Sequence, residues 1–210
     1  MTKNREDYIK RIFQFEEENI PVSNKLLADT LEIAPASVSQ MIAKLVESNL
    51  VTYENGQVKL LDAAIIIAKQ LVSKHRLWEA FLLKNLNYSW AEVHDDAELL
   101  EHATSPFLME KLNEFLNYPT HCPHGGRIYV NTLDYSDNLS PLSDLSVGSL
   151  GQIKRLSENS DFLRELKDLN LNIEDQIEVI KVNDLISITS KEKEITLSKH
   201  LAKQIYIEVI

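Results

Sequence analysis

Apolar residues recur at helical spacing through the N-terminal part of the chain, with turn signals between the periodic stretches. One apolar face, from Tyr8 to Phe15, predicts a helix over residues 5–18. Pro21 ends that helix, and Ser23 is placed to cap a short second helix. A third helix is predicted from about Ala36 to Ser48. Two short helices joined by a tight turn predict a helix-turn-helix.

The next segment, residues 51–60, predicts a β-hairpin directly after these helices. Asn55-Gly56 separates two β-prone stretches, and a type I′ turn needs positive φ at both central positions. A hairpin in this place is a wing. Residues 1–61 are therefore predicted to form a winged-helix DNA-binding domain.

The middle of the chain predicts three amphipathic helices, over residues 62–84, 91–103 and 106–116. Their apolar faces need a partner, and the simplest partner is a second copy of the chain. Residues 62–133 are therefore predicted to form the helical dimerisation domain of a homodimer.

In the C-terminal part of the chain, the pattern of apolar residues changes from helical spacing to short strand-like stretches. Residues 134–148 are rich in Ser, Asp and Pro and predict a linker. Beyond them, five short strands and one helix over residues 161–169 predict a small SH3-like barrel at 149–210. The predicted fold class is mainly α with a small all-β C-terminal domain.

Composition limits the cellular compartments and the binding partners that we expect for this protein. The chain of 210 residues has no run of about 20 apolar residues that could span a membrane. Its charged N-terminus does not resemble a signal peptide, and the single cysteine, Cys122, has no partner for an intramolecular disulfide. We expect a cytoplasmic protein with no membrane partner.

The net charge of −10 argues at first against binding to nucleic acid. Residues 61–150 carry 6 basic and 12 acidic side chains, so most of the excess negative charge lies in the middle of the chain. Bound divalent cations would cancel part of it. DNA binding then requires only local phosphate contacts.

The strongest chemical signal is the segment VHDDAELLEH, residues 93–102. On a helix, His94, Glu98, Glu101 and His102 point to one side, because they are spaced i, i+4, i+7 and i+8. Two imidazoles and two carboxylates suit a divalent metal such as Mn, Fe, Zn or Co. The alternative is a solvated acidic face.

Two further segments offer metal ligands. His75 and Glu79 lie at i and i+4 on the preceding helix, although such a pair is often only a surface contact. Cys122 and His124, in a Pro- and Gly-rich turn, can offer a thiolate and an imidazole to one metal; the alternative is an ordinary loop.

The chain lacks the motifs of common enzymes. It has no nucleotide-binding glycine motif, G-x-S-x-G elbow, H-E-x-x-H or C-x-x-C. We therefore expect no enzyme activity. The alternatives are a metal-dependent hydrolase that uses the His/Glu cluster and a winged-helix regulator that needs no metal.

With these motifs, the chain resembles the diphtheria-toxin-repressor family of metal-dependent regulators, including its manganese-sensing and streptococcal-type members. The matching stretches run in order along essentially the whole chain: EDYIKRIF, LADTLEIAPASVSQMIAKLVESNLV, SKHRLWEAFL, VHDDAELLEH, CPHGG and ITLSKHLAKQIYIEVI. The resemblance implies winged-helix, metal-binding dimerisation and SH3-like (FeoA-like) domains. It implies a repressor of metal-uptake genes that binds double-stranded operator DNA.

The resemblance also implies two metal sites per subunit. One site would use Glu79, Cys122 and His124, with Asp161 or Glu158 from the barrel, and His75 and His94 lie where other members recruit imidazoles. The other would use Asp7, Glu98, Glu101 and His102, with His75 as a further candidate. A cation that joins Asp7 to the helical domain would set the spacing of the two recognition helices.

Two departures from the family pattern bear on which metal binds. Lys10 stands where manganese-selective members with a two-metal cluster carry a second acid, and Glu98 stands where the iron-responsive branch carries cysteine. An oxygen-rich site favours Mn²⁺ or Fe²⁺, whereas Cys122 favours softer metals. We expect Mn²⁺, with Fe²⁺ as a close second and Zn²⁺ as a substitute.

The recognition helix offers small and polar side chains to DNA. Glutamine can read adenine, serine can contact base edges or phosphates, alanine can meet a thymine methyl, and lysine can bind phosphates; the alternative for each polar residue is simple solvent exposure. The candidates are Ala36, Ser37, Ser39, Gln40, Lys44 and Lys59.

Overall fold

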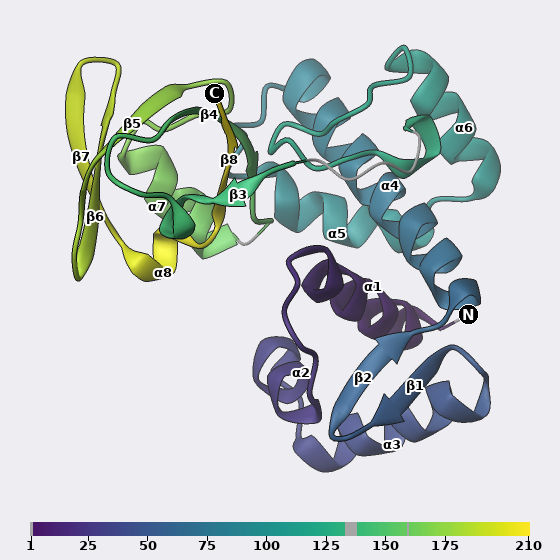
Figure 1. Cartoon of the computed structure of the whole chain (residues 1–210). Coiled ribbons are helices and arrows are strands. Elements are labelled where there is room, and N and C mark those ends of the chain that lie inside the picture. The colour runs from purple at the N-terminus through teal and green to yellow at the C-terminus, as the bar shows by residue number, and fades with distance from the viewer. Residues whose placement is uncertain (1, 133–137, 159) are drawn as a thin grey trace. The chain divides into compact units, whose positions relative to one another are not determined.

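The computed structural model describes residues 2–132, 138–158 and 160–210 (Figure 1). It divides into two compact units, residues 1–73 and 74–210, and the boundary falls inside one long helix, α4 (Asp62–Leu86). None of the helices in these ranges is both long and apolar enough to cross a membrane.

The first unit is a winged helix. Its elements are α1 (Lys3–Glu17), α2 (Asn24–Leu31), α3 (Pro35–Glu47), β1 (Val51–Glu54) and β2 (Gln57–Leu60). The Ser23 side chain accepts a hydrogen bond from the Leu26 amide at 3.1 Å and so caps α2. The wing turns at Asn55 and Gly56, both with positive φ, as the hairpin signal predicts.

The apolar periodicity of the helices closes the core of this unit. The side chains of Ile9, Leu27, Val38 and Leu45 are buried together with Val58 of the wing. The predicted helix-turn-helix and wing are therefore confirmed.

The second unit begins with a helical part formed by the end of α4, by α5 (Val93–Ala103) and by α6 (Pro106–Phe115). Ser105 caps α6 through the Leu108 amide, and Pro106 occupies the first turn, where its missing N–H leaves no donor unsatisfied. Two apolar clusters hold these helices together, one around Leu77 and Leu112 and one around Leu82 and Val93.

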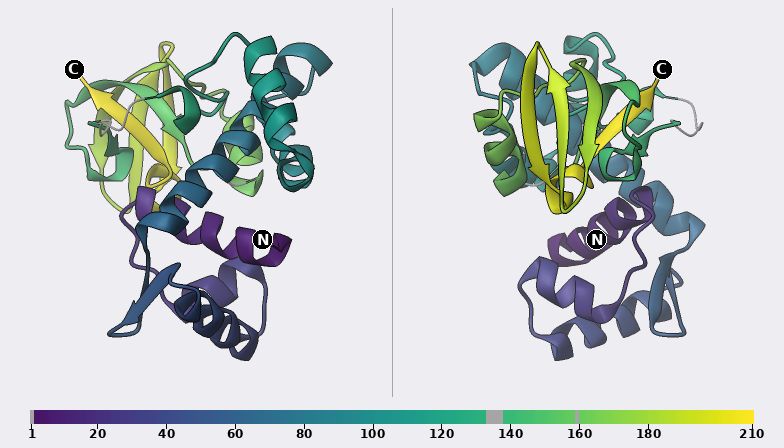
Figure 2. Two further views of the ribbon diagram at one scale, coloured as in Figure 1. Left: turned by 90° about the vertical axis from the view of Figure 1, so that its right-hand side faces the viewer. Right: turned by 60° about the vertical axis from the view of Figure 1, so that its left-hand side comes forward.

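The rest of this unit is an antiparallel sheet of six strands in the order β3-β8-β4-β5-β6-β7, and the strands β5, β6 and β7 are seen side by side in Figure 2. Its elements are β3 (Ser140–Pro141), β4 (Leu150–Leu156), α7 (Ser160–Asp168), β5 (Gln176–Val182), β6 (Leu185–Ser190), β7 (Lys193–Ser198), α8 (Lys199–Ala202) and β8 (Ile205–Val209). The five predicted strands and the helix are present. The alternate residues Ile177, Val179, Ile186 and Ile188 face one buried core.

The structure differs from the prediction at the linker, 134–148. Residues 134–137 lie outside the described residues, but Ser140–Pro141 forms β3, which pairs with β8, and a 3-10 turn, Leu142–Asp144, follows. Leu142 is fully buried in the barrel core. A two-residue edge strand that contains proline is too short to give an alternating pattern, so the sequence hides it.

Candidate metal centre and nucleic-acid interface

Side chains that can bind a metal come together in the second unit from two helices and one loop. The helical spacing of His75 and Glu79 on α4 turns both inward, and α5 faces them with its own polar stripe. The loop between α6 and β3 adds Cys122 and His124, and all of these except His94, Glu98 and His102 are buried.

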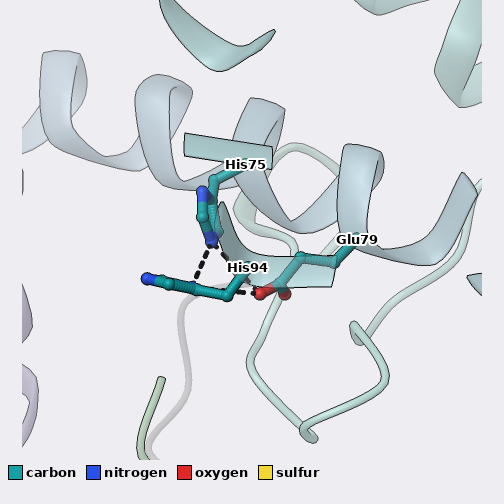
Figure 3. Close-up of side chains that lie close together, drawn as sticks. All are labelled: His75, Glu79 and His94. Carbon is teal, nitrogen blue, oxygen red and sulfur yellow. Dashed lines mark hydrogen bonds and ion pairs between the residues drawn. The ribbon is translucent and has the colours of Figure 1, made fainter. Parts of the chain in front are cut away.

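The first group joins α4 to α5 (Figure 3). His75 Nε2 lies 3.1 Å from Glu79 Oε1 and 3.0 Å from His94 Nδ1. Glu79 Oε1 is also 3.5 Å from His94 Nδ1, so the three ligand atoms surround one position.

The second group shares Glu79 and brings in the loop. His124 Nδ1 lies 3.2 Å from Glu79 Oε1 and 3.9 Å from Cys122 Sγ. The opposite nitrogen of this ring, Nε2, donates to the Trp90 carbonyl at 2.6 Å. That hydrogen bond leaves Nδ1 of the neutral ring with a lone pair that faces Glu79 and Cys122, as a metal ligand requires.

The third group lies on the other side of His75. His75 Nδ1 is 2.7 Å from Glu101 Oε2 and 3.7 Å from Glu98 Oε2. His102 Nε2 is 3.3 Å from Glu101 Oε1. Glu101 thus connects His75 to His102, and the other predicted ligands of α5, His94 and Glu98, lie within 3.7 Å of His75.

The residues present fit a divalent cation. Glu79 Oε1 is within 3.5 Å of nitrogens of His75, His94 and His124, while Glu79 Oε2 is buried without a hydrogen-bond partner among the described residues. Leaving a buried carboxylate oxygen unsatisfied is unfavourable unless a cation or donor meets it. Mixed nitrogen, oxygen and sulfur ligands suit Mn, Fe, Zn or Co.

Protonation in this centre follows from burial and neighbouring charge. Burial raises the pKa of Glu79, but the imidazoles of His124 and His75 outweigh it and hold that pKa well below its usual range. Burial lowers the pKa of His124, and Glu79 more than reverses this, so the net shift is upward. Burial, with the charges of Glu79 and Glu158, raises the pKa of the Cys122 thiol well above its usual range.

The barrel brings Glu158, rather than Asp161, to the centre. Glu158 Oε1 lies 3.7 Å from Cys122 Sγ and 2.7 Å from Arg76 Nε. Burial raises the pKa of Glu158, but Arg76 lowers it to about 2. The Asp161 side chain is 94% exposed and lies 3.3 Å from the Arg164 guanidinium.

Sequence reasoning missed Arg76. Its signal was a single arginine between His75 and Glu79, a cation on the same turn of helix as two candidate ligands. The guanidinium is buried and also donates from Nη1 to the Arg127 carbonyl at 2.7 Å.

The loop that carries Cys122 and His124, called the ligand loop below, packs against the barrel through two glycines. Gly125 has φ +76°, and a Cβ there would lie 1.8 Å from the Lys154 carbonyl oxygen. A Cβ on Gly126 would lie 2.5 Å from Glu158 Oε1. Only glycine allows the loop to come this close to β4.

In the first unit, the outward face of α3 carries the predicted DNA contacts. The residues Ala36, Ser37, Ser39, Gln40 and Lys44 are exposed there, and Lys59 is exposed on the wing. The Ser39 hydroxyl donates to the Pro35 carbonyl and accepts from Asn24, so it is already used locally. Asp7 lies half-buried on α1 of the same unit, and its role as a ligand stays a prediction.

The fold and the clustered ligands define a class, the winged-helix regulators with a separate metal-binding domain. The chain matches the family models of the iron dependent repressor: the N-terminal DNA binding domain over residues 1–57 and the metal binding and dimerisation domain over residues 62–129. Residues 140–209 match the FeoA domain. The chain belongs to the iron-dependent repressor family, which includes the diphtheria toxin repressor.

Relatives and solved structures agree along the whole chain. The iron-dependent repressor IdeR of Mycobacterium leprae is 26% identical, with 98% of this chain and 96% of IdeR covered. The structure of the manganese regulator SloR is 32% identical with a TM-score of 0.88, and each chain is covered completely. A manganese-dependent transcriptional repressor in complex with manganese is 30% identical with a TM-score of 0.90, covering 98% of this chain and 100% of the other.

Proposed function

We propose that this protein is a metal-dependent transcriptional repressor that binds operator DNA as a homodimer, responds to Mn²⁺ or Fe²⁺ and controls metal-uptake genes. The observation that carries the proposal is the convergence on Glu79: one oxygen faces three imidazole nitrogens, and the other is buried without a hydrogen-bond partner among the described residues. We place it in the cytoplasm, where operator DNA lies.

One proposed site uses Glu79, Cys122 and His124, with Glu158 rather than Asp161 as the carboxylate from the barrel. The 3.7 Å between Cys122 Sγ and Glu158 Oε1 supports this choice, as does the exposure of Asp161. His75 and His94 contact the same Glu79 oxygen as His124 and are further nitrogen ligands in the proposal. A bound cation supplies the positive charge that lets these acids lie side by side.

The second proposed site uses Glu98, Glu101 and His102, with His75 beside them. The contacts of Glu101 with His75 and His102 support this grouping. The family resemblance adds Asp7 of the DNA-binding domain, which would couple metal binding to the position of the recognition helix. We expect Asp7→Ala to abolish the dependence of operator binding on metal; unchanged metal-dependent binding would contradict the assignment.

The DNA-binding surface is proposed to be the exposed face of α3 together with the wing. Two such helices in a dimer can meet major grooves about 34 Å apart. Gln40→Ala should relax base preference at one position by about 1–3 kcal/mol, whereas Lys44→Ala should weaken binding to all sequences alike. Gel shifts on a set of operator variants separate the two effects; full sequence preference in Gln40→Ala would reject its role.

The dimer is proposed to form through the helical part of the second unit. Large apolar side chains are exposed there on α5, on α6 and after it: Leu99, Phe107, Phe115 and Tyr118. Such side chains on neighbouring elements are typical of a surface that a partner covers. We divide the chain into domains at 1–61, 62–133 and 149–210, with β3 joining the last domain from residue 140.

The decisive experiment measures operator binding with Mn²⁺, Fe²⁺, Zn²⁺ and chelator side by side, for the native chain and for Glu79→Gln. We expect binding with Mn²⁺ or Fe²⁺, none with chelator, and a large loss in the variant. Glu165→Gln, an exposed acid on α7, is the matched control. Binding that ignores chelator would instead favour a metal-independent regulator, and turnover of phosphoesters by the metal-loaded protein would favour a hydrolase.

A further inference from the structure

Arg76 joins three segments of the second unit inside the protein. Its Nε donates to Glu158 Oε1 at 2.7 Å and its Nη2 to Glu158 Oε2 at 3.4 Å, which makes a two-point contact with the carboxylate. Its Nη1 donates to the Arg127 carbonyl at 2.7 Å. The guanidinium on α4 is thus connected to the ligand loop and to Glu158, two residues beyond the end of β4.

This ion pair is shielded from water. The side chains of Arg76 and Glu158 are only 4% and 6% exposed. Removing one partner of a buried ion pair leaves an uncompensated charge in the interior, which is strongly destabilising. The planar fork of arginine matches a carboxylate in a way that the point charge of lysine does not.

Gly126 of the ligand loop packs directly against this ion pair. A Cβ on Gly126 would lie 2.5 Å from Glu158 Oε1 and 2.6 Å from Arg76 Nε. Two residues before Gly126, the His124 carbonyl accepts a hydrogen bond from the Leu156 amide of β4 at 2.9 Å. Hydrogen bonds between protein groups therefore join the ligand loop to the barrel.

A second ion pair between the same two parts is a natural contrast. Arg164 of α7 lies 3.3 Å from Asp95 of α5, but their side chains are 59% and 65% exposed. Exposed pairs contribute little to stability because water and salt screen them. Of these two ion pairs, only the buried one, Arg76–Glu158, can contribute much to holding the barrel against the helical part.

We propose that Arg76 is the built-in cation that holds the C-terminal barrel on the helical domain in the metal-free protein, and that it thereby positions Glu158 beside Cys122. Docking of the barrel then precedes metal binding rather than following from it. The proposal concerns the metal-free protein, so its outcome is independent of which metal the centre binds.

The test is amide hydrogen exchange, residue by residue, on the full chain with chelator present. The Leu156 amide reports contact with the loop, and the neighbouring Ser157 amide, which donates to the Gln204 carbonyl inside the barrel, reports the barrel itself. We expect Arg76→Gln and Glu158→Gln each to speed exchange at Leu156 at least about tenfold, with Ser157 unchanged. The double variant should exchange no faster than either single variant, because both remove one interaction.

Arg164→Gln is the matched control and should stay within about twofold of the native chain. Arg76→Lys keeps the charge without the fork, so it should give a smaller increase that is still confined to Leu156. The proposal fails if Leu156 exchanges at the native rate in Arg76→Gln, or if Arg164→Gln has an equal effect. Equal acceleration at Ser157 in both Arg76 variants also overturns it, because the barrel would then be unfolding rather than separating.

Discussion

His75 Nδ1 lies 2.7 Å from Glu101 Oε2, and neither side chain is exposed to solvent. The other ring nitrogen of His75 lies 3.1 Å from Glu79 Oε1. A neutral imidazole carries one N–H, so one nitrogen can bind a metal while the other donates to a carboxylate. This one ring therefore touches both proposed metal sites.

The position of His75 predicts that its loss affects both sites. We expect His75→Ala to weaken Mn²⁺ binding about 10- to 100-fold at each of two sites per subunit, the usual effect of losing a ligand-orienting partner. Cys122→Ser should weaken one site only. Equilibrium dialysis with metal analysis measures both, and His200→Ala, an exposed histidine on α8, is the control. Two unaltered sites in His75→Ala would contradict the shared role.

The barrel carboxylate can be assigned by comparing two acids three positions apart. We expect Glu158→Gln to weaken Mn²⁺ binding about 10- to 100-fold, because it removes the carboxylate beside Cys122. Asp161→Asn should leave affinity unchanged, since that side chain faces solvent. Calorimetric titration of both variants tests this, and the reverse ranking would return the role to Asp161.

The Cys122 thiol predicts a pH dependence of stability in the metal-free protein. Its pKa is raised by burial and by Glu79 and Glu158, so the folded state keeps a proton that the unfolded state loses above about pH 8.5. Stability should therefore fall as pH rises above that value, relative to Cys122→Ser, by up to about 1.4 kcal/mol per pH unit. Urea unfolding of both proteins across this range measures the difference.

Saturation with metal should abolish that decline above about pH 8.5, because the metal-bound Cys122 is already a thiolate in the folded state. Below that value, where only the unfolded state keeps the proton, the stability of the metal-bound protein should rise with pH. A difference between native protein and Cys122→Ser that stays constant with pH in chelator would show that the thiol keeps its ordinary pKa.

Two glycines with the same backbone angle allow the loop contact to be tested alone. Gly56 and Gly125 both have φ +76°, but a Cβ on Gly56 meets nothing within 4 Å, whereas one on Gly125 would lie 1.8 Å from the Lys154 oxygen. Gly56→Ala should lower the free energy of unfolding by about 1–2 kcal/mol from backbone strain. Gly125→Ala should lower the free energy of unfolding by about 1–3 kcal/mol more than Gly56→Ala does, because the added methyl group overpacks the contact with β4. Equal losses in urea titrations would argue against the close approach.

The helices and the wing could be predicted because each has a local signal. Helical spacing turns His94 and Glu101 to one side of α5, and Asn55-Gly56 is a turn signal that needs no tertiary information. The candidate ligands on α4 and α5 could therefore be predicted from the sequence alone.

The choice between Glu158 and Asp161 could not be made from sequence. It depends on where β4 ends and α7 begins: Glu158 falls in the connection between them, against Cys122, while Asp161 falls in the first turn of α7 and faces water. Boundaries of elements are the least predictable feature of a chain. Arg76 was missed for a related reason, because its partner is 82 positions away.

Trp90 is one of only two tryptophans in the chain, and its ring centre lies 6.0 Å from that of His124. Its own carbonyl accepts the hydrogen bond that orients the same imidazole. A paramagnetic ion held by His124 would come close enough to this indole to quench its fluorescence. The protein thus carries an intrinsic optical probe. The metal occupancy of the site that contains His124 can be followed in solution without a dye or a label.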